Sequence, residues 1–264
     1  MHILLVGLGN MGLKYLKKLE ELGLKPVLCD KNPEKLNIGK DYPFYFHLGD
    51  VKEDITHAIV AVNPEEHVKV AKELLNRGVK VLLEKPPAIT SKEFSEIYQN
   101  PNLEISEIEL YSEAVKNFPH DVEPREIFIE RLNKGRGYIN PLWDLAWHDL
   151  YILQYLFGKV EVEEVKKNGV VWELLGKVKG SVPFRLRVAW DYPGQVRRWV
   201  VKTDKGDVIM DFSNEELIFG NINRSRLYGD KLREMVQDFI EGVRREGSRK
   251  RAMENLKVLE SLKV

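Results

Sequence analysis

One stretch near the N-terminus decides the fold, and it reads Ile3-Leu4-Leu5-Val6-Gly7-Leu8-Gly9-Asn10-Met11-Gly12. Its apolar start ends at a glycine, as a buried strand of a parallel sheet does. The glycines then follow the spacing G-x-G-x-x-G, in which the first permits a tight turn and the second lets a pyrophosphate approach the backbone. The third lets the next helix pack closely on the strand. We therefore predict a dinucleotide-binding turn with cofactor contacts across Gly7–Gly12. The alternative is a tight turn that binds nothing.

The residues that follow this turn alternate between helical and strand patterns. Apolar spacing predicts helices over 11–22 and 64–76, and strands over 26–30, 57–62, 79–83 and 103–110. Such alternation favours a parallel sheet covered by helices on both faces. The fold class we expect is α/β, with an N-terminal Rossmann-type doubly wound parallel sheet in a domain of residues 1–117.

The chain changes character after residue 117, where residues 117–124 contain two prolines and little periodicity. We predict a domain crossing there. A second domain, residues 118–264, should be α+β with an open, mainly antiparallel sheet. Its predicted elements are a strand at 125–132, a helix at 141–157, an antiparallel meander at 160–219, and closing helices at 230–245 and 251–262.

An acidic residue stands where a cofactor's ribose would lie. Asp30 follows Gly12 by 18 residues and ends the second predicted strand. A carboxylate there accepts hydrogen bonds from the ribose hydroxyls and repels a 2′-phosphate, which favours NAD. Lys31 weakens this argument because its ammonium could pair with that phosphate. NADP therefore stays open.

A charged pair follows the strand at 79–83, in the stretch Glu84-Lys85-Pro86-Pro87. The carboxyl ends of parallel strands line the ligand crevice of a doubly wound sheet. Two prolines make the chain leave the strand rigidly, which can hold the ammonium of Lys85 in place. That ammonium could stabilise a developing alkoxide on a substrate. The other interpretation is an ion pair in solvent.

A carboxylate and an imidazole stand one helical turn apart in the predicted helix 141–157. Asp144 and His148 have i,i+4 spacing, so they share a face of a helix that is otherwise mostly apolar. Buried polar groups are costly unless they are paired or used. Asp144 could orient His148 and stabilise its protonated form. A packing role for the pair is the alternative. No third His or Cys has suitable local spacing for a metal site.

The composition bounds the class of protein. The 264 residues are 43% hydrophobic and 31% charged, with 41 basic and 41 acidic residues. A net charge of zero gives no electrostatic reason to bind nucleic acid or an anionic membrane. A single cysteine, Cys29, and the lack of a signal-peptide pattern or long apolar run predict a cytoplasmic protein. The chain contains only four glutamines but many lysines and glutamates, a composition that is typical of thermophile proteins.

Together these features resemble the Gfo/Idh/MocA oxidoreductase family. The resemblance covers residues 1 to about 158. The stretches that carry it are Gly7–Gly12, Val62-Asn63-Pro64-Glu65-Glu66-His67, Glu84-Lys85-Pro86-Pro87-Ala88, and Asp144-Leu145-Ala146-Trp147-His148.

The resemblance implies hydride transfer between NAD(P) and a sugar, polyol or sugar derivative. It implies that Lys85 contacts substrate and cofactor, that His148 exchanges the proton, and that Asp144 is its partner or a substrate ligand. It also implies a loop along the cofactor. The cofactor residues expected besides the turn are Asp30, Lys31, Asn63, Pro64, His67, Glu84 and Lys85. Tyr111 joins Lys85, Asp144 and His148 as a candidate substrate residue.

The chain also departs from the pattern of that family. Many members carry a glycine pair before the Asp-x-x-x-His helix, whereas this chain reads Tyr138-Ile139-Asn140-Pro141. The substrate therefore stays open. Two alternatives also remain, namely a dinucleotide-binding regulator without turnover and a related reductase acting on an imine.

The predicted sheet of the second domain suggests a partner surface. Its segment from Val182 to Phe219 is rich in aromatic residues and has too little helix to cover it. We predict a homodimer or homotetramer through this sheet. The aromatic residues that motivate the prediction are Trp190, Tyr192, Trp199, Phe212 and Phe219.

Overall fold

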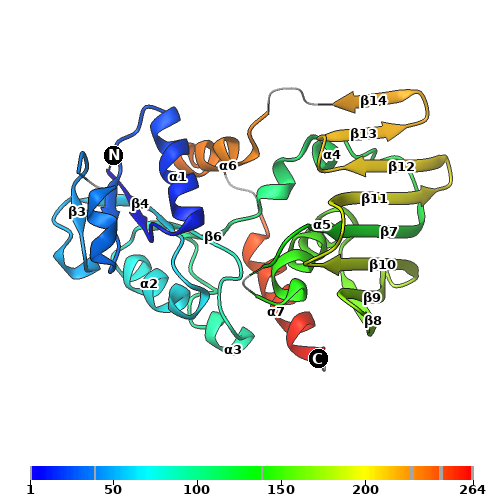
Figure 1. Cartoon of the computed structure of the whole chain (residues 1–264), viewed down its shortest axis with the longest axis horizontal. Coiled ribbons are helices and arrows are strands. Elements are labelled where there is room, and N and C mark those ends of the chain that lie inside the picture. The colour runs from blue at the N-terminus through cyan, green and yellow to red at the C-terminus, as the bar shows by residue number, and fades with distance from the viewer. Residues whose placement is uncertain (1, 39, 138, 226–228, 244–245, 263–264) are drawn as a thin grey trace. The chain divides into compact units, whose positions relative to one another are not determined.

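The computed structural model describes residues 2–38, 40–137, 139–225, 229–243 and 246–262 (Figure 1). By its internal contacts the chain forms two units. Unit 1 combines Met1–Ser106 with Leu232–Leu256, and unit 2 combines Glu107–Lys231 with Lys257–Val264. The first piece of unit 1 thus ends earlier than the predicted boundary at 117, and unit 1 also includes the later segment Leu232–Leu256.

Unit 1 contains a six-stranded parallel sheet in the order β3-β2-β1-β4-β5-β6. The strands are β1 (His2–Val6), β2 (Val27–Cys29), β3 (Phe44–Tyr45), β4 (Ile55–Val60), β5 (Lys80–Leu83) and β6 (Leu103–Ile105). This is the strand order of a Rossmann sheet, so the predicted fold class is confirmed. The order reverses at β1, which places the glycine turn after β1 at the point where such sheets bind ligands.

The helices of unit 1 are α1 (Asn10–Glu21), α2 (Pro64–Asn76), α3 (Ser91–Phe94), α6 (Lys231–Glu241) and most of α7 (Ser248–Ser261). Three of them, α1, α2 and α6, begin within one residue of their predicted starts, whereas α7 begins at Ser248, before the predicted 251, and α3 was not predicted. Pro64 opens α2, where its missing N–H costs nothing. Tyr15 of α1 and Met235 of α6 both contact the Ser106 hydroxyl, so the two helices cover the same side of the sheet (Figure 1). The helix predicted over 230–245 ends at Glu241, and Arg244 and Arg245 lie outside the described residues.

The strand predicted over 103–110 is wrong beyond Ile105. β6 pairs only with β5, and the last pair in that register is Leu83 with Ile105. Because β5 ends there, the chain has no strand to follow. It turns instead into a 3₁₀ helix over Ile108–Tyr111.

Unit 2 contains an eight-stranded mixed sheet in the order β14-β13-β12-β11-β7-β10-β9-β8 (Figure 1). Its strands are β7 (Pro124–Leu132), β8 (Val160–Asn168), β9 (Val171–Val178), β10 (Val182–Ala189), β11 (Val196–Thr203), β12 (Gly206–Asp211), β13 (Glu216–Phe219) and β14 (Ile222–Ser225). All neighbours are antiparallel except β7 and β10. The predicted open, mainly antiparallel sheet is therefore confirmed.

The single meander predicted over 160–219 is wrong at one position. β7 lies between β10 and β11, so the chain steps across it between Ala189 and Val196. The inward side chains Ile127 and Ile129 of β7 are buried. Burial of these two apolar side chains stabilises β7 at the centre of the sheet rather than at its edge.

The helix predicted over 141–157 begins as a π-helix. The π-helical turn covers Leu142–Ala146 and continues as α5 (Trp147–Phe157). Gly158, with φ of +81°, ends it. Unit 2 also contains the short α4 (Glu113–Lys116). π-Helical turns are frequent at functional sites, and this one carries Asp144. No helix in the described part of the chain is long and apolar enough to cross a membrane.

Candidate cofactor and active-site residues

The glycine turn has the geometry of a phosphate cradle. Gly7 has φ of +91°, and a Cβ there would lie 2.5 Å from the Ala61 carbonyl oxygen. A Cβ on Gly12 would lie 1.9 Å from the Gly7 oxygen. A Cβ on Gly9 would meet nothing within 4 Å, so open space faces this backbone. Gly7 and Gly12 are thus needed for packing, while Gly9 leaves room for a ligand at the start of α1.

The Asp30 carboxylate is hydrogen-bonded to the backbone of the glycine turn. Its Oδ2 accepts a hydrogen bond from the Leu8 N–H at 2.6 Å, and its Oδ1 accepts one from the Asn32 N–H at 2.8 Å. A carboxylate has about four acceptor sites, so two further donors can still bind. The arrangement suits a pair of ribose hydroxyls.

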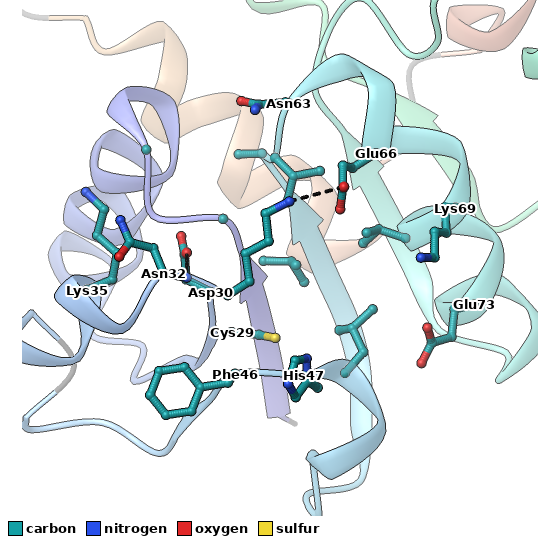
Figure 2. A pocket seen from close by; sticks show the side chains of 18 of the residues that line it. Cys29, Asp30, Asn32, Lys35, Phe46, His47, Asn63, Glu66, Lys69 and Glu73 are labelled. Carbon is teal, nitrogen blue, oxygen red and sulfur yellow. Dashed lines mark hydrogen bonds and ion pairs between the residues drawn. The ribbon is translucent and has the colours of Figure 1, made fainter.

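A cavity of about 650 Å³ lies in front of these residues, entirely within unit 1 (Figure 2). This volume falls within the usual range for cofactor sites. Lys31 donates to Glu66 at 3.1 Å, and this ion pair spans the β2 and α2 sides of the cavity (Figure 2). The residues that we predicted and that line the cavity are Gly7, Gly9, Asp30, Lys31 and Asn63.

The other predicted cofactor residues do not line this cavity. Leu8 and Gly12 are buried, whereas Asn10 is exposed and Met11 half-buried at the start of α1. Pro64 begins α2. His67 is buried between two carbonyl oxygens, with Nδ1 at 2.7 Å from Pro86 and Nε2 at 3.0 Å from Val62. Burial lowers the pKa of His67, although the two carbonyls oppose that effect. His67 therefore joins α2 to the Lys85–Pro86 turn.

Glu84 holds the base of the Lys85 turn. Its buried carboxylate accepts a hydrogen bond from the Tyr15 hydroxyl at 2.5 Å and another from the Lys85 backbone N–H at 3.0 Å. Lys85 is half-buried and precedes a cis peptide bond to Pro86. The solvent ion pair that was the alternative for this stretch is thus wrong for Glu84.

His148 has a tyrosine partner that the sequence did not reveal. The His148 Nδ1 lies 3.1 Å from the hydroxyl of Tyr151, and that oxygen accepts the Glu109 N–H at 2.9 Å. Burial, together with Glu109, raises the pKa of Tyr151 well above its ordinary value, so the phenol keeps its proton. Asp144 and His148 are both half-buried. Tyr111 is buried at the end of its 3₁₀ helix.

A buried ion-pair network stands behind Tyr151 in unit 2. Arg131 donates to Asp149 at 2.8 and 3.0 Å and to Glu109 at 3.2 Å. Lys231 donates to the second oxygen of Glu109 at 2.7 Å, and the Trp199 indole N–H donates to Asp149 at 2.8 Å. Every charge in this network is therefore matched by an opposite charge within hydrogen-bond distance.

Several of these residues escaped prediction, for two different reasons. Asp149 stands inside an apolar helix directly after His148, and a carboxylate in that setting is a signal of a buried partner. Glu109 was placed in a strand, which hid its role. The unpredicted cavity residues come from loops after β2 and β3 or from the exposed side of α2, where no motif marks them. They include Lys35, Phe46, His47, Lys69 and Glu73, and Glu66 joins them although it lies in the stretch from Val62 to His67.

Comparison with known families agrees with this geometry. Residues 1–101 match the model of an oxidoreductase family with an NAD-binding Rossmann fold, GFO_IDH_MocA. This match confirms, for this part of the chain, the resemblance predicted from the sequence. No curated protein matches the chain.

Solved structures share the fold over nearly the whole chain. UDP-N-acetylglucosamine 3-dehydrogenase from Acidithiobacillus ferrooxidans is 19% identical with a TM-score of 0.85, covering 98% of this chain and 96% of that one. Levoglucosan dehydrogenase in complex with NADH is 12% identical with a TM-score of 0.82, covering 99% and 96%. The WlbA dehydrogenase from Bordetella pertussis, with NADH and UDP-GlcNAcA, is 15% identical with a TM-score of 0.79, covering 99% and 94%. At these identities the likeness concerns the fold.

Proposed function

We propose that this protein is an NAD(P)-dependent oxidoreductase that transfers a hydride between nicotinamide and a secondary alcohol or ketone. The observation that carries the proposal is the cavity in front of Gly9 and Asp30, in a Rossmann unit that matches an oxidoreductase family. The substrate class we propose is a sugar, polyol or nucleotide sugar. The sugar and nucleotide-sugar dehydrogenases of the same fold support this class.

We assign the chemical steps to three side chains of this chain. The bound nicotinamide supplies the hydride chemistry. Lys85, fixed at its backbone by Glu84, polarises the substrate oxygen. His148 takes the hydroxyl proton in the oxidative direction, and Asp144 supports its protonated form. These roles follow the family resemblance and the environment that each residue has within its own unit.

Tyr151 determines which nitrogen of His148 we assign to proton exchange. Because Tyr151 contacts Nδ1 at 3.1 Å and is itself fixed by the Glu109 N–H, the imidazole is held in one orientation. We assign the exchange of the substrate proton to the other ring nitrogen, Nε2. Tyr151 is thus a positioning residue in this proposal.

The experiment that tests the function is a search for hydride transfer. The protein is incubated with NAD or NADP and a panel of sugars, polyols and nucleotide sugars, while nicotinamide absorbance is followed. Mass spectrometry of small molecules retained through a gentle purification directs the choice of panel. Transfer to or from any of these excludes the regulator without turnover. Transfer found only with imines would replace the alcohol chemistry proposed here.

Asp30 should select NAD over NADP. Asp30→Ala should weaken NAD binding about 10- to 100-fold, the loss expected for hydrogen bonds to a charged group. This variant also removes the acceptor for the Leu8 N–H, so part of the loss comes from the loosened turn. Asp30→Asn is the matched variant, because it keeps one acceptor oxygen but not the charge. It should relax discrimination against NADP while retaining more of the affinity. Calorimetric titration of both cofactors measures these effects. Stronger NADP than NAD binding by the unmutated protein would contradict the assignment.

We also propose that the protein assembles through its second sheet, although the residues differ from those first considered. Trp199 and Phe212 are buried inside unit 2 and cannot contact a partner. The opposite face carries a half-buried apolar row in cross-strand register, made of Phe128, Val200, Ile209 and Ile218.

Breaking this row should dissociate the assembly. Val200→Glu places a charge in the middle of the row and should convert a dimer or tetramer at micromolar concentration into a monomer. Val170→Glu, at an exposed valine in the β8–β9 turn, is the control and should leave the mass unchanged. Light scattering measures both variants. If the unmutated protein is a monomer under these conditions, the proposed assembly is wrong.

Three further proposals rest on sequence composition alone. The single cysteine, Cys29, supports a cytoplasmic location. The balanced charge argues against nucleic acid or anionic membranes as partners. The low glutamine content favours a thermophilic source.

A further inference from the structure

Two arginines face each other on neighbouring strands of unit 2. Arg197 of β11 stands directly opposite Arg131 of β7 in the antiparallel register. Both lie on the same face as the buried Trp199, two residues further along β11. Like charges directly opposite each other destabilise a sheet unless something compensates them. A pair of this kind on an inner face therefore calls for an explanation.

Arg131 is fully compensated by the protein itself. Its side chain is 3% exposed, and its donors bind Asp149 and Glu109. The second oxygen of Glu109 is occupied by Lys231, and Asp149 also accepts from Trp199. The carboxylates nearest to Arg131 are thus already engaged with other donors.

Arg197 is compensated far less. Arg197 is half-buried, and in the described part of the chain the one hydrogen bond of its side chain runs from Nε to the neutral Asn133 Oδ1, at 3.4 Å. A guanidinium has five N–H donors, so most of its capacity is not used by this bond. Burial and Arg131 lower the pKa of Arg197, while Glu109, Asp149 and Asp144 act in the opposite direction. Asp144 is thus among the charged groups that act on the Arg197 guanidinium.

We propose that Arg197 binds an anionic group of the substrate, through two oxygens of a carboxylate or a phosphate. The planar fork of arginine matches either group in a bidentate manner, and partial burial strengthens such bonds. The charge of this ligand would compensate Arg197, the less compensated arginine of the two. The inference rests on the proposed function in one respect, namely that the ligand is the substrate. It narrows the substrate class to sugars that carry a phosphate or a carboxylate.

Binding of three compounds to the full-length protein tests the proposal. UDP-N-acetylglucosamine carries phosphates, glucuronate carries a carboxylate, and myo-inositol is neutral. Calorimetry is done with saturating NADH, so that an alcohol cannot be oxidised during the titration. We expect the unmutated protein to bind at least one of the two anions about tenfold or more tightly than myo-inositol. The anion that binds identifies the phosphate or the carboxylate as the recognised group.

Variants of β11 assign that preference to one residue. Arg197→Gln should weaken binding of the preferred anion about 10- to 100-fold and leave myo-inositol unchanged. Arg197→Lys keeps the charge but not the fork, so we expect an intermediate loss. Arg198→Gln is the matched control, because Arg198 is the next residue and its exposed side chain lies on the opposite face. It should bind as the unmutated protein does. NADH affinity serves as the check that each variant is folded.

Equal affinity of the unmutated protein for charged and neutral compounds would overturn the proposal. The proposal would also be overturned if Arg197→Gln and Arg198→Gln bound the anion equally well. A third contradicting result would be folded Arg197→Lys and Arg197→Gln variants that bind the anion as tightly as the unmutated protein. These readouts do not depend on turnover. An Arg197-dependent anion preference without hydride transfer would refute the proposed reaction and keep the anion site. Hydride transfer without an Arg197-dependent anion preference would support the proposed reaction and refute the anion site.

Discussion

His148→Ala should cut the rate of hydride transfer by about 10²–10⁴-fold, the usual contribution of a general acid–base group. Affinity for NADH should remain nearly unchanged, because the cavity lined by Gly9 and Asp30 lies in unit 1, whereas His148 belongs to unit 2. Single-turnover absorbance of the nicotinamide measures the rate once a substrate is known. His120→Ala is the control, since His120 is an exposed histidine of the same unit.

The pH profile separates a catalytic from a packing role for His148. The oxidative rate should rise with pH as the imidazole loses its proton, and this limb should vanish in His148→Ala. Asp144→Asn should also slow turnover, but the two losses should not add, because residues that act as a unit are non-additive. A His148→Ala variant that retained the full rate and the same profile would make His148 a packing residue.

Arg131→Leu should lower the free energy of unfolding by about 3–5 kcal/mol, the cost of breaking a buried ion pair by removing one partner. The variant leaves Asp149 and Glu109 buried with their main counter-ion gone. Urea unfolding of the full chain, followed by tryptophan fluorescence, reports on this site because Trp199 binds Asp149. Arg125→Leu, an exposed arginine on the same strand, is the control and should change the midpoint little.

The loss of unfolding free energy in Arg131→Leu should also depend on pH. Burial alone would raise the pKa of Glu109, but Arg131 and Lys231 hold it below its ordinary value. The unmutated protein therefore gains stability from this carboxylate at neutral pH and loses that gain as the pH falls through the lowered pKa. Without Arg131 the carboxylate takes up a proton more readily, so the difference between variant and parent should shrink in acid. A difference that stays constant from pH 7 to pH 4, or a midpoint like that of Arg125→Leu, would contradict the assigned role.

The sequence predicted unit 1 well because local rules and the tertiary fold agree there. The glycine spacing, Pro64 at the start of α2 and the apolar strand runs each specify one backbone geometry. In the candidate site, Gly7, Gly9 and Asp30 were found in this way, and their types and spacing follow from the shape of a dinucleotide. Asn63 was named through the family resemblance instead.

The sequence could not reveal contacts between residues far apart in the chain. Tyr151 lies in the predicted helix 141–157, but its bond to the Glu109 N–H depends on the turn that follows β6. The position of β7 between β10 and β11 depends on which strands bury the most apolar surface, which no local pattern encodes. Arg197 and Arg131 are opposite each other only because of that strand order.

Unit 1 is built from two pieces of chain that lie far apart in the sequence. The second piece supplies contacts that the first cannot replace, including Phe239 against His57 and Ser248 bonded to the Ile105 N–H. During synthesis on a ribosome, the dinucleotide-binding unit therefore stays incomplete until the residues up to Leu256 have emerged. For the same reason, exchanging this unit between relatives requires two grafts made together, one for each piece.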